Sequence, residues 1–475
     1  MQSTIHFFGG AGTVTGSNFL LQSSSSDRSI GVGVKILIDC GLFQGERAAE
    51  VGNWEPFPFD PKEISVLVNT HAHIDHIGRI PKLVKEGFAG KIISTEATRA
   101  LALPMLIDAM NLSTHTAEHL GKEPLYEQKD IDQAMKQWEG VSYHQTQDMG
   151  DGVSMQFLNS GHILGSAMAE FTRGDKKIVF TGDLGGGNSP LLPLAENPQG
   201  IQYLLMESVY GDRMQSDDAQ SRKDQLENVI EDTIARGGTL LIPAFSTERT
   251  QDLLFDIREL MLQKRVPSVP VYLDSPLAEK ITAAYLAHPQ YFNEALQARV
   301  KEGEHIFAFP ELHYVESAAD SQKIVNAKGS KIIIAGSGMS NGGRVQAHER
   351  EVLPDTHSTL LIVGYQAAGS LGRRLAEGVK SVSIHGAPGQ ANTTVTVACK
   401  VEALYGYSAH MNSEQLLEFV NKINDGKEGT PEALREVFVV MGEPASSSFL
   451  AQRIRDYLGV KATTPHVGEK AQIEF

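Results

Sequence analysis

Thr70-His71-Ala72-His73-Ile74-Asp75-His76-Ile77-Gly78 is the stretch that decides how this chain is organised. It follows an apolar run, 64–68, which is typical of a buried strand. Imidazole and carboxylate groups in such a cluster suit zinc, manganese or iron. A loop at a strand end can direct His71 and His73 to one cation and Asp75 and His76 to another. A polar loop with chance histidines is the alternative interpretation.

Three later strands in the sequence lead into side chains of the same chemical kind. The alternating run 153–160 is followed by His162, the run 177–180 by a Thr-Gly-Asp turn, and the run 203–206 by Glu207. The C-terminal ends of strands in one sheet can lie at one edge, where ligands collect. We therefore expect His162, Asp183 and Glu207 to join the first cluster.

Asp39 follows another apolar run, 34–38, and precedes a glycine turn. A carboxylate in this place can anchor a metal-binding histidine through the second ring nitrogen of that histidine. An Asx turn, in which the side chain only bonds to its own backbone, is the alternative.

These side chains fit a centre for two metal ions. A water molecule held between two cations loses its proton near neutral pH and becomes a nucleophile. Cations about 3.5–4 Å apart also offset the charge on a phosphoryl oxygen. Site one would take His71, His73 and His162, site two would take Asp75 and His76, and Asp183 would bridge the two.

A leaving alkoxide needs a proton, and His410 in the turn 408–410 is the candidate general acid. A pairing with Glu207 would raise the imidazole pKa and fix the ring. His385 is a weaker candidate, because it lies in an alternating strand where a structural role is favoured. His115 and His119 have helical spacing, but their polar segment favours a solvated helix face. Asp75, Glu207 and His410 are thus the predicted catalytic residues.

Composition limits the classes of protein that fit. The chain has 475 residues, 41% apolar and 21% charged, which predicts a globular protein of two or three domains. Cys40 and Cys399 could form at most one bridge, which favours a reducing cytoplasm. No bilayer-spanning run and no signal peptide are present, so no membrane partner is expected. The net charge of −16 means that any nucleic-acid binding must depend on a local patch and on metal charge.

Strands and helices alternate between 239 and 363, which predicts a separate parallel-sheet unit. A polar linker at 213–220 is the candidate boundary before it, and the pattern becomes β-rich again after Ser381. We expect one domain at 1–212, a second at 213–380, and a return to the first at 381–475.

The glycine-rich segment 336–344 follows a strand in this second unit. Backbone amides at a helix start can cradle phosphate, and a plain tight turn is an equally good interpretation. Residues 331–380 hold six basic and four acidic side chains, which gives modest support to a polyanion track, and an ordinary mixed surface is an equally good interpretation. The candidate substrate-binding residues are Ser337, Gly338, Arg249 and Arg344.

Taken together, these motifs resemble the metallo-β-lactamase superfamily, and more narrowly its β-CASP branch of nucleases. The superfamily pattern is matched by Asp39, by 71–76, by His162 and by Asp183. The branch adds an acid matched by Glu207 and a Ser-x-His histidine matched by His410. The segments 242–245, 274–277, 336–339 and 364–366 also look like that branch. The resemblance covers nearly the whole chain.

The resemblance implies an α/β protein: an αββα metallo-β-lactamase domain interrupted by a β-CASP domain with a parallel sheet, and an active site in the cleft between them. Similar proteins are mostly RNA-processing exo- and endonucleases that use zinc and leave a 3′-hydroxyl and a 5′-phosphate. We therefore expect a cytoplasmic, zinc-dependent ribonuclease with two zinc ions, and a homodimer is compatible with this. The alternatives are a DNA-processing nuclease acting on single strands, a lactam or thioester hydrolase, and a weakly active scaffold subunit of a processing complex.

Two positions depart from the pattern of the family. RNA-acting members usually carry a histidine, the last ligand of site two, where this chain has Met441 in the turn 440–443. A thioether is a poor ligand for zinc held by oxygen and nitrogen, so site two is expected to hold its metal weakly. DNA-acting members also lack that histidine. Glu248 stands where glycine is usual, and its carboxylate could hinder a polyanion.

Overall fold

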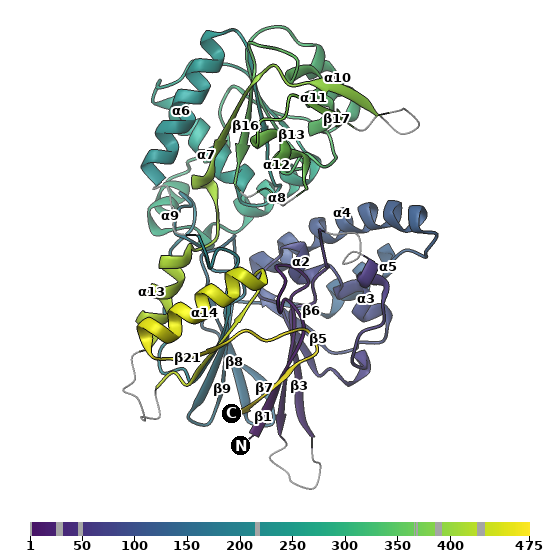
Figure 1. Cartoon of the computed structure of the whole chain (residues 1–475), viewed down its shortest axis with the longest axis vertical. Helices are drawn as coiled ribbons and strands as arrows, with labels where there is room; N and C mark the ends of the chain where they lie inside the picture. The colour runs from purple at the N-terminus through teal and green to yellow at the C-terminus, as the bar shows by residue number, and fades with distance from the viewer. Residues whose placement is uncertain are drawn as a thin grey trace. The chain divides into compact units, whose positions relative to one another are not determined.

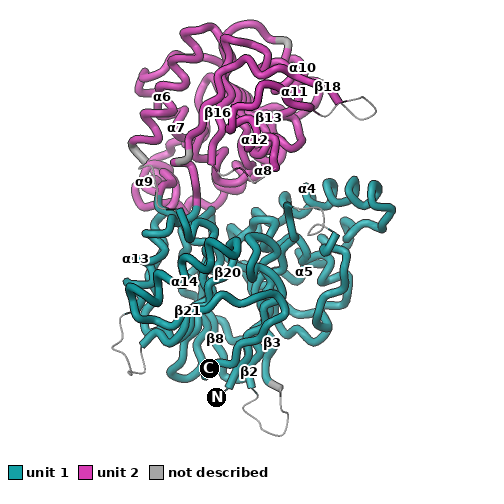
Figure 2. The backbone as a smooth tube through the Cα atoms, in the orientation of Figure 1, with its two compact units in different colours: residues 1–187, 193–215, 410–475 teal, residues 188–192, 216–409 magenta. Residues whose placement is uncertain are grey.

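The computed structural model describes residues 2–24, 32–45, 51–213, 219–364, 366, 369–384, 392–424 and 433–475. The chain forms two compact units, coloured separately in Figure 2. Unit 1 comprises Met1–Gly187, Pro193–Gln215 and His410–Phe475, and unit 2 comprises Asn188–Leu192 and Ser216–Ala409. His385, the weaker candidate acid, lies outside the described residues.

Unit 1 contains two sheets of seven strands. The first has the order β22 (Lys470–Glu474), β1 (Gln2–Gly9), β2 (Asn18–Ser24), β3 (Val32–Ile38), β4 (Val66–Val68), β5 (Lys91–Thr95), β6 (Trp138–Val141). The second has the order β21 (Lys461–Thr463), β20 (Glu436–Val440), β11 (Tyr203–Glu207), β10 (Lys176–Phe180), β9 (Ala167–Arg173), β8 (Val153–Asn159), β7 (Gln147–Gly150).

The two sheets pack face to face through alternate side chains. In β1 every second residue is buried, including Ile5 and Phe7, because successive side chains of a strand point to opposite faces. The Phe7 ring lies 5.8 Å from the ring of Phe438 in the other sheet, and Phe19 lies 6.4 Å from Phe180. These aromatic pairs join the sheets into one apolar core.

Helices cover the outer faces of the sandwich (Figure 1). The helices α13 (Ser413–Ile423) and α14 (Pro444–Leu458) pack apolar residues such as Phe419 and Leu450 on the second sheet. The helices α3 (Ile80–Lys85), α4 (Glu96–Leu120) and α5 (Gln128–Gln137) lie beside the first sheet. The predicted αββα layering is therefore confirmed. Helix α4 includes His115 and His119, and the His115 side chain is exposed, in agreement with the solvated helix face expected there.

Unit 2 is built on a six-stranded parallel sheet, as predicted. Its order is β14 (Leu312–Tyr314), β13 (Val271–Asp274), β15 (Lys331–Ala335), β12 (Thr239–Pro243), β16 (Thr359–Val363), β19 (Lys400–Leu404). The strands β15 and β16 are buried along their whole length, because helices cover both faces of a parallel sheet. The helices are α6 (Ala219–Ala235), α7 (Arg249–Leu262), α8 (Pro276–Ala287), α9 (Glu294–Lys301), α10 (Ala318–Asn326), α11 (Val345–Val352) and α12 (Leu371–Ala376). A hairpin of β17 (Ser381–Ile384) and β18 (Thr393–Thr396) accompanies them.

The end of unit 2 differs from the domain boundary expected after residue 380. Strand β19 pairs in parallel with β16, with Thr359 opposite Lys400, so the segment up to Ala409 belongs to this sheet. The β-rich pattern after Ser381 identifies strands correctly, but an alternating pattern does not say which sheet a strand joins. Pairing across the sheet makes that choice.

The structure also bears on the compartment and membrane expectations. Both cysteines are buried and unbridged. Within the described ranges, none of the helices combines the length and the apolar character that crossing a bilayer would need.

Glu349 on α11 is a buried acid whose ionisation should affect stability. Within the described part of the chain, neither of its carboxylate oxygens has a hydrogen-bond partner. Burial raises the pKa of Glu349 to about 7, and nearby Ser340 only partly offsets this. Because the folded-state pKa lies above the ordinary value of 4.5, Glu349 lowers the stability of the fold progressively as the pH rises from 4.5 to about 7.

Glu349→Gln is therefore expected to be more stable than the natural chain at pH 8, by up to about 3 kcal/mol, and similar to it at pH 4.5. Thermal unfolding followed by circular dichroism at the two pH values measures the difference. Glu351→Gln, at an exposed position of the same helix, serves as the control. Equal stability of natural chain and Glu349→Gln at pH 8 would contradict the assignment.

Candidate metal centre

The strand directions of unit 1 bring distant residues to one edge. Strand β9 is antiparallel to both β8 and β10, so β8 and β10 run the same way, and β11 and β20 are parallel to β10. In the other sheet β3, β4 and β5 are mutually parallel. The C-terminal ends of these strands therefore carry the site. They are followed by Asp39 (β3), His71 and His73 (β4), His162 (β8) and Asp183 (β10), while Glu207 ends β11.

The loop after β4 passes into the short helix α2 (Ile74–Ile77), which holds Asp75 and His76. Its backbone runs against the turn after β3, where a Cβ added to Gly41 would lie 1.5 Å from the carbonyl oxygen of Asp75. The Cys40 amide donates to the His76 carbonyl at 2.8 Å. The Asp-Cys-Gly turn thus fixes the position of the histidine loop, and only glycine fits at residue 41.

Four potential ligand atoms converge at this edge. Nε2 of His71 lies 3.1 Å from Nδ1 of His73, which lies 3.2 Å from Nε2 of His162. Oδ2 of Asp183 lies 3.5 Å from Nε2 of His71 and 3.4 Å from Nε2 of His162. All four atoms are within 4.8 Å of one another. The structure therefore brings together the four residues expected around site one.

The spacing of these atoms fits a tetrahedral cation. Ligands about 2.0–2.1 Å from a tetrahedral metal are about 3.3–3.4 Å apart, which agrees with the four separations above. Burial, and then the nearby His76, lower the pKa of His71 well below its ordinary value. The imidazole is therefore neutral, which is the form that binds metal.

Asp39 orients His76, one of the two residues expected at site two. Its Oδ2 lies 2.7 Å from Nδ1 of His76, and its other oxygen accepts hydrogen bonds from the Asn69 side chain at 2.9 Å and the Thr70 amide at 2.8 Å. Ser17 donates to the same carboxylate at 3.1 Å. Because Nδ1 of His76 is occupied by a carboxylate, Nε2 is the nitrogen available to a metal.

Nε2 of His76 faces two carboxylates. It lies 3.4 Å from Oδ1 of Asp183 and 3.9 Å from Oδ2 of Asp75. Within the described residues, Nε2 of His76 and Oδ1 of Asp183 are buried atoms without a hydrogen-bond partner of good geometry. Buried polar atoms left in this state indicate a missing ligand. The donor set of two carboxylates and one imidazole fits a second divalent cation.

The charges of the site are strongly coupled. Burial raises the pKa of Asp183, but His76 and His71 more than offset this and hold it well below the ordinary value. Burial lowers the pKa of His76, yet Asp183 and Asp39 raise it well above its ordinary value. Burial raises the pKa of Asp75 to about 6. Without a metal ion, protons on His76 and Asp75 therefore offset the negative charge of the carboxylates. Bound cations would replace those protons.

Glu207 and His410 form a pair beside the ligand atoms. Nδ1 of His410 lies 3.0 Å from Oε1 of Glu207, and that oxygen also accepts from the Leu184 amide at 2.7 Å. Suitable atoms of Asp183, Glu207 and His410 lie within 4.8 Å of one another. Burial raises the pKa of Glu207, and His410 partly offsets this. The histidine ring is oriented by the carboxylate and lies 4.6 Å from the ring of His162.

The four candidate substrate-binding residues all lie in unit 2. Arg344 donates to Oδ1 of Asp274 at 2.7 Å and to two backbone carbonyls. Its guanidinium is therefore hydrogen-bonded to groups of unit 2. Arg249 is 8% exposed and donates to Glu248. A Cβ at Gly338 would lie 2.7 Å from the Phe245 amide, so the glycine permits close backbone packing. Neither arginine is thus available as a surface cation in this structure.

Three family models match the chain in sequence order. The Metallo-beta-lactamase superfamily model matches residues 30–232, the Beta-Casp domain model 250–375, and the Zn-dependent metallo-hydrolase RNA specificity domain model 394–465. Ribonuclease TTHA0252 of Thermus thermophilus is 34% identical over 413 residues, covering 87% of this chain and 89% of the relative. This chain belongs to the metallo-β-lactamase superfamily, in its β-CASP branch. The family expected from the sequence motifs is therefore confirmed.

Other β-CASP relatives extend the comparison. Transcription termination factor FttA of Methanosarcina mazei is 32% identical, over 87% of this chain and 64% of that protein. FttA of Cenarchaeum symbiosum is 30% identical, over 98% of this chain and 70% of that protein. A solved protein of unknown function from Enterococcus faecalis aligns over 100% of both chains with a TM-score of 0.54 and 12% identity, which supports the fold alone. The family implies that the chain binds divalent metal.

Sequence reasoning missed three side chains that support the metallo-β-lactamase site. Ser17, Asn69 and Thr70 all donate to Asp39, and Oγ1 of Thr70 also lies 3.1 Å from Nδ1 of His71. The adjacency of Asn69 and Thr70 to the histidine motif was the signal for two of them. Ser17 lies in a separate turn, so only the folded structure brings it to the site.

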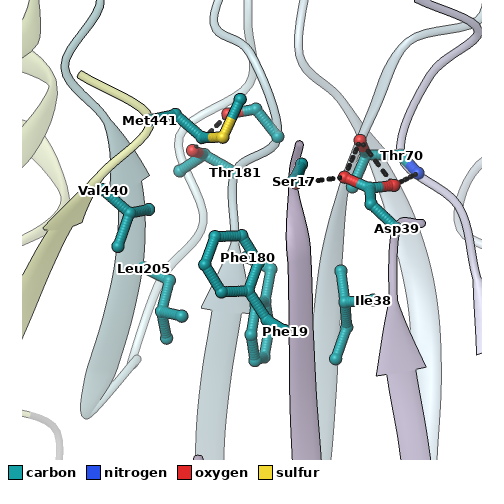
Figure 3. A pocket seen from close by; sticks show the side chains of 11 residues that line it. Ser17, Phe19, Ile38, Asp39, Thr70, Phe180, Thr181, Leu205, Val440 and Met441 are labelled. Atoms are coloured by element: carbon teal, nitrogen blue, oxygen red, sulfur yellow. Dashed lines mark hydrogen bonds between the residues drawn. The ribbon is translucent and has the colours of Figure 1, made fainter. Parts of the chain in front are cut away.

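Met441 occupies the turn where RNA-acting β-CASP members usually carry a histidine. It is buried, and a Cβ on Gly10 would lie 2.4 Å from its sulfur, so the thioether packs against that backbone. Figure 3 shows Met441 and Thr181 on one side of a small cavity, with Asp39 and Thr70 on the other. The cavity measures about 10 Å³, which is about the space of one water molecule. The thioether therefore contributes apolar packing at this turn.

Met441→His is expected to strengthen binding of the second metal ion and to raise the hydrolysis rate, because imidazole is a far better zinc ligand than thioether. Isothermal titration of metal-free protein with zinc measures the affinity of the weaker site. Met441→Leu keeps the apolar packing and is the matched control. Unchanged zinc affinity and unchanged rate in the histidine variant would mean that this turn lies away from the metals.

Proposed function

We propose that this chain is a cytoplasmic ribonuclease that uses two zinc ions to hydrolyse RNA phosphodiester bonds, leaving 5′-phosphate and 3′-hydroxyl ends. The observation that carries the proposal is the convergence of three imidazole nitrogens and one carboxylate oxygen at zinc-like spacing, beside the Glu207–His410 pair. The name of the Thermus relative, a ribonuclease, and the description of the C-terminal model as an RNA specificity domain support RNA as the substrate.

In this proposal the ligand atoms divide between two cations. When bound, zinc supplies Lewis-acid polarisation of a phosphoryl oxygen and lowers the pKa of water. Asp39 keeps Nε2 of His76 directed into the site by holding Nδ1. The first ion would be held by His71, His73 and His162, the second by Asp75 and His76, and Asp183 would serve both.

The chain also supplies the proton that departing RNA needs. Glu207 is a carboxylate acceptor, so Nδ1 of His410 donates to it, and Nε2 is the ring atom that can carry a second proton. In hydrolysis that leaves a 5′-phosphate, the oxygen of a water molecule bonds to phosphorus as the bond from phosphorus to the 3′-oxygen breaks, and the 3′-oxygen takes up the proton from Nε2. The buried carboxylate stabilises the protonated imidazole before transfer.

The test incubates zinc-loaded protein with 5′-end-labelled RNA and, in parallel, with single-stranded DNA of the same sequence. Cleavage of RNA that stops with a chelator and returns with added zinc is the expected result. Faster cleavage of the DNA would favour the DNA-processing alternative. No cleavage of either strand by protein shown to hold two zinc ions would overturn the proposal.

A further inference from the structure

A turn with unusual backbone geometry connects β12 to α7. The Arg249 amide donates to the Thr247 carbonyl at 2.9 Å, and Glu248 between them has φ 67° and ψ −61°. These values define a γ-turn with positive φ at its centre, a rare and strained conformation for a residue with a side chain. Strain of this kind persists where the surroundings hold it in place.

The Glu248 carboxylate is buried and engages a guanidinium. It accepts a hydrogen bond from Nη1 of Arg249. Nε of Arg249 is buried and lacks a hydrogen-bond partner within the described residues. A guanidinium with one edge bound to a carboxylate and an unused N–H has the donors that a phosphate group would take. The Glu248 carboxylate therefore occupies the guanidinium edge that an external anion would otherwise contact.

Two other acids near this turn in sequence, Asp252 and Asp256, have partners of their own. Arg222 donates to Asp256 at 2.9 Å, so that pair is complete. Asp252 accepts from a serine hydroxyl, and its pKa is raised well above the ordinary value by burial and then by the charge of Glu248. Within the described part of the chain, Glu248 is the acid that accepts a hydrogen bond from Arg249.

The Glu248–Arg249 pair follows β12, at the carboxyl-terminal edge of the parallel sheet. Strand β12 lies between β15 and β16 in the sheet. A Cβ on Gly338, after β15, would lie 2.7 Å from the Phe245 amide, and a Cβ on Gly364, after β16, would lie 2.9 Å from Nε of Arg249. The loops after three adjacent strands thus meet around the guanidinium. In parallel α/β sheets, ligands bind outside these carboxyl ends.

We propose that Glu248 is a specificity-determining residue that occupies Arg249 and so weakens the binding of RNA phosphates at this edge. The inference rests on the proposed ribonuclease function and names a determinant within it. A strand of RNA gains the Arg249 contact only by breaking the hydrogen bond between Arg249 and Glu248 and by desolvating its own phosphate. Removing the carboxylate frees the guanidinium for a phosphate and, when glycine replaces it, also relieves the positive φ.

The experiment measures binding of a fluorescently labelled oligouridylate by anisotropy. All proteins carry zinc and His410→Ala to slow cleavage, and a gel verifies that the RNA stays intact. Glu248→Gly is expected to bind about tenfold tighter, as one charge-assisted contact predicts. The slope of log affinity against log salt should steepen by about 0.7, because one more phosphate of a single strand is neutralised.

Two matched variants separate charge from backbone strain. Glu248→Ala should show the same gain in affinity but a lower melting temperature than Glu248→Gly, since alanine keeps a Cβ at positive φ. Adding Arg249→Gln to Glu248→Gly should return affinity and salt slope to those of the parent.

The outcomes distinguish this inference from the proposed function. If the parent binds RNA and Glu248→Gly binds it equally, the inference is wrong and the ribonuclease proposal stands. A gain that persists after Arg249→Gln also overturns the inference, because another group would then be responsible. If no variant binds RNA and zinc-loaded natural protein does not cleave it, the proposed function fails and the inference fails with it.

Discussion

His73→Ala is expected to lower the rate of RNA hydrolysis by roughly a thousandfold or more, the largest effect of any single change considered. Nδ1 of His73 lies 3.1 Å from Nε2 of His71 and 3.2 Å from Nε2 of His162, so it is central to the site-one ligand atoms. Removing it leaves two imidazoles and one carboxylate for that cation. Steady-state cleavage of labelled RNA gives the rate, and elemental analysis gives the zinc content.

A loss of activity could also follow from misfolding, so the variant needs a matched control. His115→Ala removes an exposed histidine from α4, where the side chain is 77% exposed, and should leave rate and zinc content unchanged. Circular dichroism should show the same fold in both variants. Near-normal activity of His73→Ala with full zinc content would refute its assignment as a ligand.

His410→Ala is expected to slow RNA cleavage by about 10²- to 10⁴-fold while slowing hydrolysis of a p-nitrophenyl phosphodiester much less. A 3′-alkoxide is a poor leaving group that needs a proton, whereas p-nitrophenolate leaves without one. The position of the ring against Glu207, 3.0 Å from Oε1, is the basis for this role. Parallel rate measurements on the two substrates provide the ratio.

The control for this prediction is His144→Ala, at a half-exposed histidine outside the ligand cluster, which should affect neither substrate. Glu207→Gln should show the same substrate dependence in weaker form, because the amide still orients the ring but no longer stabilises its positive charge. Equal slowing of both substrates in His410→Ala would remove this residue as the general acid.

Much of the centre could be predicted from local sequence because its residues stand next to strands. The apolar runs before His71, His162 and Asp183 have recognisable strand patterns, and β4, β8 and β10 confirm them. The predicted neighbours do lie together, since strands that run the same way bring their ends to one edge. The α/β class and the parallel sheet of unit 2 follow from the same patterns.

Other features depend on contacts that a local pattern does not contain. The sequence places Arg249 and Arg344 near a glycine-rich loop, but their hydrogen bonds to Glu248 and Asp274 become visible only in the folded unit. Ser17 reaches Asp39 from a separate turn for the same reason. A side chain's partner is set by packing between distant segments, and charge counts along the chain do not reveal it.

The sequence by itself determined the types of the candidate ligands, their order along the chain and the strands that carry them, because strand patterning and side-chain chemistry are local properties. Only the tertiary structure decided which sheet β19 joins, which atoms lie at metal-like spacing, and which charges are already neutralised. Those outcomes depend on distances between residues far apart in sequence. They are fixed when the sheets pair and the apolar core excludes water.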